Sequence, residues 1–224
     1  MNTMDFEQAR FNMVEQQIRT WEVLDQDVLD LLFTVKREDF VPVAYRAIAF
    51  TDMEIPLGHD QVMMPPKLEA RIVQEVAPKS GEHVLEVGTG SGYLTALLAK
   101  CAQRITSIEY FEDFSLEAAT RLTAAHIANV VLKAGDAGRS PDAFLDAQDR
   151  FDVIVLAGSV QTVPQAYLQR LNVAGRFFAI VGDAPVMKAT LITKTAENQY
   201  VSAELFETVV PPLINAAQPS RFDF

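Results

Sequence analysis

From Lys67 onward, apolar residues alternate between two spacings that predict secondary structure. Apolar positions three and four residues apart are typical of helices, and short, nearly continuous apolar runs are typical of strands buried on both faces. The helical spacing covers residues 67–76, 91–101, 111–126 and 164–171, and the apolar runs cover residues 83–87, 104–109, 129–133 and 151–156. This alternation predicts an α/β protein with a doubly wound, mostly parallel sheet and right-handed crossovers.

The segment before this alternation has a different character. Residues 5–18 and 24–33 carry helical apolar spacing, and Asp25 and Asp27 favour a helix start. Residues 37–66 are interrupted by prolines and Gly58, which predicts mostly loop. Because this segment also carries many large apolar residues, we expect an ordered cap on the substrate side of the fold rather than disorder. Trp21 is expected to pack beneath this cap.

The segment after Gly175 reads as strands followed by a tail. Strands are expected at residues 176–181, 189–195 and 200–208, with a hairpin around Glu197-Asn198. The whole chain is therefore predicted to form one compact domain. Its parts are N-terminal helices and cap over residues 1–66, a core over residues 67–215, and a polar, loosely held tail over residues 216–224.

Composition excludes several classes of partner. The chain has 224 residues, is 49% hydrophobic and carries a net charge of −11, without a cluster of Lys and Arg. Binding to nucleic acid or to anionic membranes needs such a cluster, so neither partner is expected. The N-terminus lacks the pattern of a signal peptide and no apolar run approaches about eighteen residues, which together predict a soluble cytoplasmic protein.

The remaining reactive residue types predict no metal site and no disulfide. Cys101 is the single cysteine and ends an apolar helix, so it is expected to be a buried thiol. His83 and His126 have no second ligand at metal spacing and are expected to be structural. The sequence leaves the oligomeric state open.

The most informative motif is a glycine-rich turn between a strand and a helix. The strand at residues 83–87 leads into Gly88-Thr89-Gly90-Ser91-Gly92, and a helical pattern follows. Glycines without a Cβ let a ligand approach the main chain, and the helix start offers free N–H groups. A dinucleotide site would have glycine at the sixth place, where this chain has Tyr93. The loop therefore favours S-adenosylmethionine, with residues 88–92 in contact with the cofactor.

Acidic residues lie at or just after the ends of three predicted strands, where a cofactor would lie. Glu86 is placed to hold the amino group of a methionine moiety, directly or through water, and Glu109 lies about twenty residues further on, where a ribose-binding acid is expected. Asp136 and Ala137 follow the third strand and are expected near the adenine amino group. Taken alone, the glycine loop could be an ordinary turn and each acid could be solvated. The glycine loop, Glu86, Glu109 and Asp136 in register along the same strands and helices together favour a binding site.

Several further motifs resemble the protein-L-isoaspartate (D-aspartate) O-methyltransferase family. The motifs that carry the resemblance, together with the glycine loop, are Met13-Val14-Glu15-Gln16-Gln17-Ile18-Arg19, Arg37-Glu38-Asp39-Phe40-Val41-Pro42, Asp52 with Pro56-Leu57-Gly58, Phe151-Asp152-Val153-Ile154 and Val209-Val210-Pro211-Pro212-Leu213. The resemblance spans nearly the whole chain. It implies a Rossmann-like S-adenosylmethionine-dependent methyltransferase fold with an N-terminal helical addition, and repair of isoaspartyl residues in damaged proteins or peptides.

The chain departs from this family in the cap loop, where the family typically has Gly-Gln-Thr-Ile-Ser. Here Asp60-Gln61-Val62-Met63-Met64 replaces it, and both hydroxyls are lost. Met64 takes the place of the family serine and, with Gln61 and His59, is a candidate catalytic position. For Val62 and Met64 the alternative is apolar packing in a loop that still folds over the cofactor, and for His59 it is an ordinary solvent-facing loop residue. Asp60 would repel an anionic substrate, and Ser159 and Gln161 are expected at the mouth of the site.

The lost hydroxyls slow the expected reaction without removing its chemical basis. A carboxylic acid with a pKa of about 4 is already ionised at neutral pH, so methyl transfer to it needs no general base. A hydroxyl bonded to an ionised group contributes roughly 1.5–3 kcal/mol, and its loss corresponds to about ten- to a hundredfold in rate. Two alternatives stay open: a relative that methylates another acceptor, such as a small molecule or modified peptide, and a non-catalytic module that only binds S-adenosylmethionine.

Overall fold

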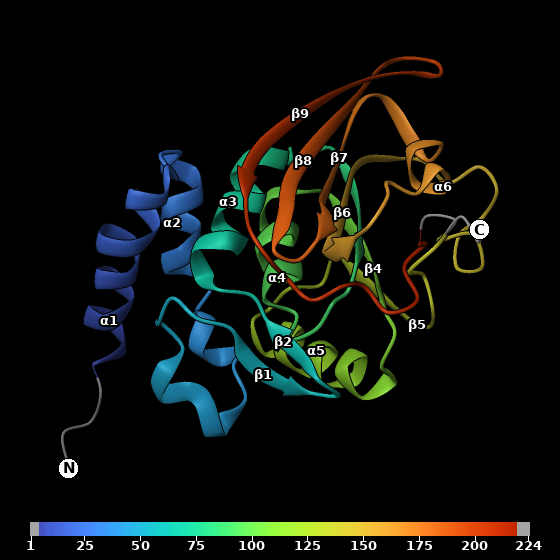
Figure 1. Ribbon diagram of the computed structural model, residues 1–224. Helices are drawn as coiled ribbons and strands as arrows, with labels where there is room; N and C mark the ends of the chain where they lie inside the picture. The colour runs from blue at the N-terminus through green and yellow to red at the C-terminus, as the bar shows by residue number, and fades with distance from the viewer. Residues whose placement is uncertain (1–4, 219–224) are drawn as a thin grey trace.

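A computed structural model describes residues 5–218 of the chain (Figure 1). The N-terminal helix α1 (Phe6–Asn12) begins at Asp5, whose carboxylate accepts hydrogen bonds from the N–H groups of Glu7 and Gln8. Its helical path continues through a π-helical segment, Met13–Ile18, as the apolar spacing predicts. Helix α2 (Gln26–Thr34) begins at Asp25, which accepts from the N–H of Asp27 at 2.9 Å. The predicted role of Asp25 at a helix start is confirmed.

The cap segment is more regular than the sequence predicts. It contains 3₁₀ turns at Arg37–Asp39 and Val43–Ile48 and an antiparallel hairpin of β1 (Ile55–Gly58) and β2 (Gln61–Met63). The prediction of mostly loop is wrong for this hairpin. Its two-residue turn places His59 at φ 50° and Asp60 at φ 55°. Two-residue turns with positive φ usually have the sequence Asn-Gly or Asp-Gly, and the sequence His-Asp does not predict one.

The main sheet has seven strands in the order β5-β4-β3-β6-β7-β8-β9. Its first five positions are parallel, and β7–β8 and β8–β9 pair antiparallel, so the predicted mostly parallel α/β sheet is confirmed. The strands are β3 (His83–Val87), β4 (Arg104–Glu109), β5 (Val130–Ala134), β6 (Phe151–Val160), β7 (Leu171–Asp183), β8 (Val186–Ala196) and β9 (Gln199–Glu207). The predicted hairpin at Glu197-Asn198 joins β8 to β9, with Asn198 at φ 59°.

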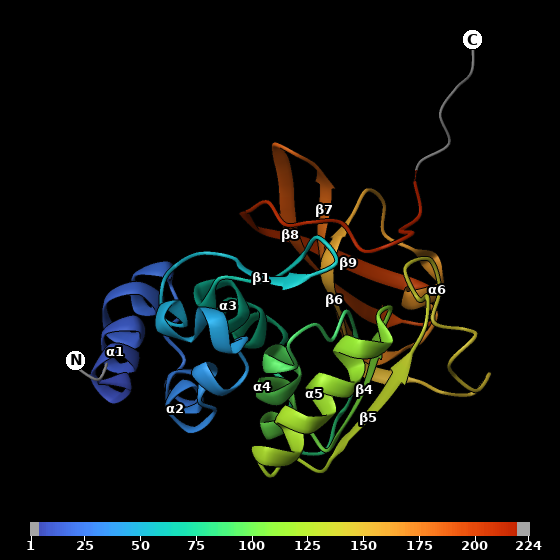
Figure 2. The same cartoon turned by 90° about the horizontal axis from the view of Figure 1, so that it is seen from below.

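Four helices flank this sheet: α3 (Pro66–Val76), α4 (Tyr93–Cys101), α5 (Glu112–Ala124) and α6 (Gln165–Leu168). The predicted helix over residues 164–171 is wrong at its end, because Leu171 already pairs with Phe151 in the sheet. Figure 2 shows α4 and α5 side by side, with α6 at the other side of the sheet. Within residues 5–218, no helix is long and apolar enough to cross a membrane.

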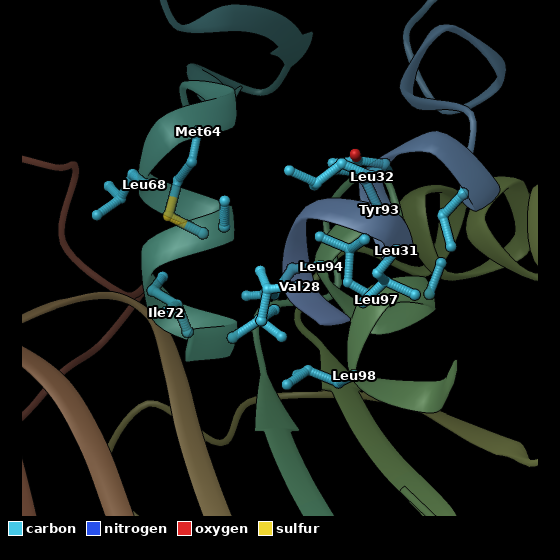
Figure 3. Packing of buried hydrophobic residues seen from close by; sticks show 14 of the residues in the cluster. Val28, Leu31, Leu32, Met64, Leu68, Ile72, Tyr93, Leu94, Leu97 and Leu98 are labelled. Carbon is cyan, nitrogen blue, oxygen red and sulfur yellow. The ribbon is translucent and has the colours of Figure 1, made fainter. Parts of the chain in front are cut away.

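Apolar residues form one buried cluster on each face of the sheet. Val84 of β3 belongs to the cluster covered by α2, α3 and α4, while its neighbour Leu85 packs with Tyr167 and Leu168 of α6. This follows from the two-residue period of a strand. Figure 3 shows the first cluster, with Met64 just before α3, Leu68 and Ile72 on α3, and Leu94 and Leu97 on α4.

One buried arginine joins the cap to the core. Arg37 is fully buried and forms an ion pair with Glu69 of α3. It also donates hydrogen bonds to the carbonyl oxygens of Ala49 at 2.8 Å and Met64 at 2.7 Å. Since a buried charge needs such partners, these contacts determine the path of the cap. The predicted tail begins with Ala216, which packs against the second cluster, and residues 219–224 of that tail lie outside the described residues.

Candidate active site

A cavity of about 710 Å³, counted to its open mouth, lies at the carboxyl ends of β3, β4 and β6. The chain runs from β3 to β4 and β5 on one side and then returns to β6 on the other side of β3. Open α/β sheets bind ligands at such a switch in strand order. Of the residues expected from sequence, those that line this cavity are Gln61, Met64, Gly88, Gly90, Glu109, Asp136 and Ala137.

The glycine loop forms one wall, and its conformation requires glycine. Gly88 lies at φ 96° and Gly90 at φ 52°. A Cβ at Gly90 would lie 3.3 Å from Leu57 Cδ1 of the hairpin. The loop therefore runs close beneath the hairpin, with main chain facing the cavity. Thr89, Ser91 and Gly92 lie in the same loop but do not line the cavity.

Glu109 lies at the end of β4 with its carboxylate facing this loop. Its two oxygens accept hydrogen bonds from the N–H groups of Gly90 at 2.8 Å and Phe111 at 3.0 Å. Burial raises the pKa of Glu109, and the backbone donors oppose that shift. The carboxylate is thus fixed in orientation beside the cavity, where it can accept hydrogen bonds from ligand hydroxyl groups.

Glu86 is fully buried and does not line the cavity. The hydroxyls of Thr95 and Ser107 donate to its Oε2 at 2.5 Å and 2.6 Å, and Thr89 Oγ lies 2.6 Å from Ser107 Oγ. Burial raises the pKa of Glu86 to about 7. Its Oε1 has no hydrogen-bond partner among the described residues. The network ties the glycine loop to β3, β4 and α4, and Glu86 is linked to the loop through the Ser107 hydroxyl.

Asp136 and Ala137 follow β5 and line the cavity. The N–H of Gly138 donates to Asp136 Oδ1 at 3.1 Å. The Asn215 side chain donates to Oδ2 at 2.8 Å. Both carboxylate oxygens are therefore held, and one of them by the C-terminal part of the chain.

The hairpin supplies Leu57, Gln61, Val62 and Met64 to the cavity wall. Met64 is 7% exposed and belongs to the main core, so it packs apolar surface as well as lining the cavity. This supports the packing interpretation of that residue. The hairpin therefore presents an apolar surface in which Gln61 contributes the polar side chain.

His59 does not line the cavity. Its Nε2 lies 2.8 Å from an Asp113 carboxylate oxygen, and its ring stacks on Phe111 at 4.2 Å between centroids. The left-handed turn places His59 against the first turn of α5. Asp60, on the same turn, is exposed and does not line the cavity.

Two parts of the lining were not expected from the sequence as site residues. One is aromatic: Tyr110, Phe111 and Phe114. The other is residues 210–214, which belong to a segment after β9, here called the C-terminal strap (residues 210–216). Figure 1 shows this strap in red passing the hairpin. The Val209-Val210-Pro211-Pro212-Leu213 motif overlaps this strap, but in the sequence it carried only the family resemblance.

Ser159 holds this strap rather than lining the cavity. Its hydroxyl donates to the Val210 carbonyl at 3.1 Å, and its N–H donates to the Pro211 carbonyl at 2.9 Å. Gln161 donates to Asp183 at 2.7 Å. Both residues line a neighbouring hollow on the other side of the strap.

The electrostatic character of the cavity suits a cationic ligand. Within residues 5–218, its lining carries the carboxylates of Glu109 and Asp136 and no Lys, Arg or His side chain. Carboxylates at the edge of a low-dielectric cavity favour positive charge nearby.

The glycine loop, the acids at the ends of β4 and β5 and the strand-order switch together define a Rossmann-like methyltransferase fold. A family model for protein-L-isoaspartate(D-aspartate) O-methyltransferase matches residues 8–218, and the chain belongs to this family.

Curated relatives agree with that family. The protein-L-isoaspartate O-methyltransferase 1 of Pelobacter propionicus is 36% identical over 180 residues, covering 80% of this chain and 83% of its own. The enzyme of the same name from Rhodopseudomonas palustris is 34% identical over 212 residues, covering 93% and 84%.

The fold is shared with solved structures. A structure described as a protein-L-isoaspartate O-methyltransferase of Plasmodium falciparum, in complex with S-adenosyl-L-homocysteine, superposes with a TM-score of 0.74. It is 18% identical and covers 95% of this chain and 99% of its own, so the likeness concerns the fold.

Proposed function

We propose that this protein transfers the methyl group of S-adenosylmethionine to the carboxylate of isoaspartyl residues in damaged proteins. The observation that carries the proposal is the cavity at the strand-order switch, walled by Gly88 and Gly90 and faced by Glu109. Membership of the isoaspartyl methyltransferase family supports the acceptor.

The residues of the cavity fit the cofactor. We assign Glu109 to the ribose hydroxyls and Asp136 to the adenine amino group, because both line the cavity, and Gly88 and Gly90 allow close approach of main chain. S-adenosylmethionine supplies an electrophilic methyl group on a positively charged sulfur. Two carboxylates without a neighbouring cation stabilise such a charge. The proposed part of Glu86 is indirect, through the loop that it supports.

The role of the protein in the reaction is to orient the acceptor and to exclude water. An isoaspartyl carboxylate is ionised at neutral pH, so no residue has to remove a proton. This agrees with the position of His59, which does not line the cavity and contacts Asp113 instead. Val62 and Met64 desolvate the acceptor, and Gln61 is the hairpin side chain that can donate a hydrogen bond to it.

The proposal is tested by comparing two peptides that differ in one linkage. Labelled methyl transfer is measured to an isoaspartyl peptide and to its α-aspartyl isomer, with binding of S-adenosylhomocysteine followed by calorimetry. We expect S-adenosylhomocysteine to bind, and we expect methyl transfer to the isoaspartyl peptide but not to its α-aspartyl isomer. A folded protein that shows no heat of association at millimolar ligand contradicts the cofactor assignment. If S-adenosylhomocysteine binds but the methyl group is transferred only to another acceptor, the proposed substrate is wrong. The same holds if the ligand binds and no component of a cell extract is methylated.

A further inference from the structure

The C-terminal strap lies directly on the loop that carries Asp136, and a glycine makes this possible. A Cβ at Gly138 would lie 2.0 Å from the carbonyl oxygen of Ile214 and 3.0 Å from the N of Ala216. No larger residue fits at position 138 without displacing the strap. Residues about 75 positions apart in sequence are therefore held in contact at the Asp136 end of the cavity.

Asn215 has the backbone and side-chain geometry of a fixed contact. It lies at φ 55°, a conformation in which Asn is among the most favoured residues after glycine. The N–H of Ala216 donates to the Leu213 carbonyl at 3.1 Å and closes a turn around it. Arg139 donates to the Asn215 carbonyl at 3.2 Å. The side-chain amide is thus presented to Asp136 by backbone that is anchored on both sides.

The contact determines how the Asp136 carboxylate faces the cavity. Asn215 Nδ2 holds one oxygen at 2.8 Å, and Gly138 N–H holds the other at 3.1 Å. A carboxylate oxygen accepts more than one hydrogen bond, so each keeps capacity for a ligand donor. Asp136 and Asn215 are both exposed, and the two hydrogen bonds favour one orientation of the carboxylate, in which it accepts from a ligand donor.

We propose that Asn215 is a positioning residue for base recognition, which holds Asp136 so that its carboxylate reads the exocyclic amino group of adenine. This inference rests on the nucleoside cofactor of the proposed function and not on the methyl acceptor. An oriented carboxylate accepts from a 6-amino purine and repels the carbonyl oxygen of a 6-oxo purine. A site built to pair one polar group discriminates strongly against the analogue that lacks it.

The test is the preference between two ligands that differ only at this position. Binding of S-adenosylhomocysteine and S-inosylhomocysteine is measured by calorimetry on the full chain and on two variants. Asn215→Gly keeps the left-handed backbone and removes the amide, and Asn215→Asp keeps the shape and places a second carboxylate against Asp136. Asn198→Gly is the matched control, because Asn198 has φ 59° but lies in the β8–β9 hairpin.

The wild type and Asn198→Gly are expected to prefer the adenosyl ligand. In both Asn215 variants we expect that preference to fall by about tenfold, the effect of weakening one charged hydrogen bond. An unchanged preference in folded Asn215 variants overturns the inference, as does a wild type that binds both ligands equally. A protein that binds neither ligand refutes the cofactor assignment itself. If the wild type prefers the adenosyl ligand but transfers no methyl group to an isoaspartyl peptide, only the proposed acceptor is refuted.

Discussion

Restoring the hydroxyls of the cap loop by Val62→Thr and Met64→Ser is expected to raise methyl transfer to an isoaspartyl peptide. Both side chains line the cavity on the hairpin side. Neither of them can donate a hydrogen bond to an acceptor carboxylate. Val62→Thr preserves shape, whereas Met64→Ser removes buried apolar volume.

The size of the effect follows from what each residue touches. A hydroxyl bonded to an ionised acceptor contributes roughly 1.5–3 kcal/mol, which corresponds to an increase of about ten- to a hundredfold in kcat/KM. Met64 is 7% exposed in the main core, so its truncation is expected to cost roughly 2–5 kcal/mol of folding free energy. The variant should therefore be faster and less stable.

The assay compares kcat/KM for the isoaspartyl peptide, with Met64→Ala as the matched variant that makes the same cavity without a hydroxyl. Urea unfolding measures stability, and S-adenosylhomocysteine affinity confirms that the cofactor site is unaltered. We expect Met64→Ala to lose stability without gaining rate. If the double variant is folded, binds the nucleoside normally and has an unchanged rate, residues 62 and 64 do not contact the acceptor.

Three further changes test the rest of the site. Arg37→Met leaves a buried carboxylate without its cation and should cost about 3–5 kcal/mol in urea unfolding; a loss below about 1 kcal/mol would disprove the role given to this ion pair. The pKa of Glu86 is raised by burial from 4.5 to about 7, so the folded state holds a proton that the unfolded chain releases, and stability from this group falls as pH rises through that window. Between pH 4.5 and 7 the free energy of unfolding of the wild type should therefore fall by about 3 kcal/mol more than that of Glu86→Gln. Unfolding free energies that change in parallel with pH in the two proteins would contradict this. Gly90→Ala places a Cβ on a residue at φ 52° and should weaken S-adenosylhomocysteine binding at least tenfold. Gly81→Ala is the control, because a Cβ there has nothing within 4 Å and should leave the affinity unchanged. Equal affinities of the two variants for S-adenosylhomocysteine would show that the loop tolerates a side chain at position 90.

The sequence predicted the parts of the site that depend on local backbone chemistry. Glycines at a strand-to-helix turn and an acid at a strand end have local causes, and Gly88, Gly90 and Glu109 all line the cavity. Glu86 is displaced from the expected place by strand parity. It shares a face of β3 with Val84, beneath α4, while Val87 at the strand end lines the cavity.

The missed parts depend on contacts between distant segments. The strap reaches the cavity through pairing of Ser159 with residues 210–213, which no local pattern announces. The position of His59 follows from an unexpected left-handed turn and from a stack on Phe111 of another element. Short-range periodicity carries no information on such contacts.

The buried contacts of Arg37 have a consequence for how the protein unfolds. One guanidinium group binds residues on both sides of the boundary near residue 66 that the sequence suggested between cap and core. A fragment starting at residue 67 would expose the apolar underside of α3 and leave an acid there without its counter-charge. Cap and core should therefore melt in one cooperative step, and limited proteolysis of the folded chain should not release a stable core.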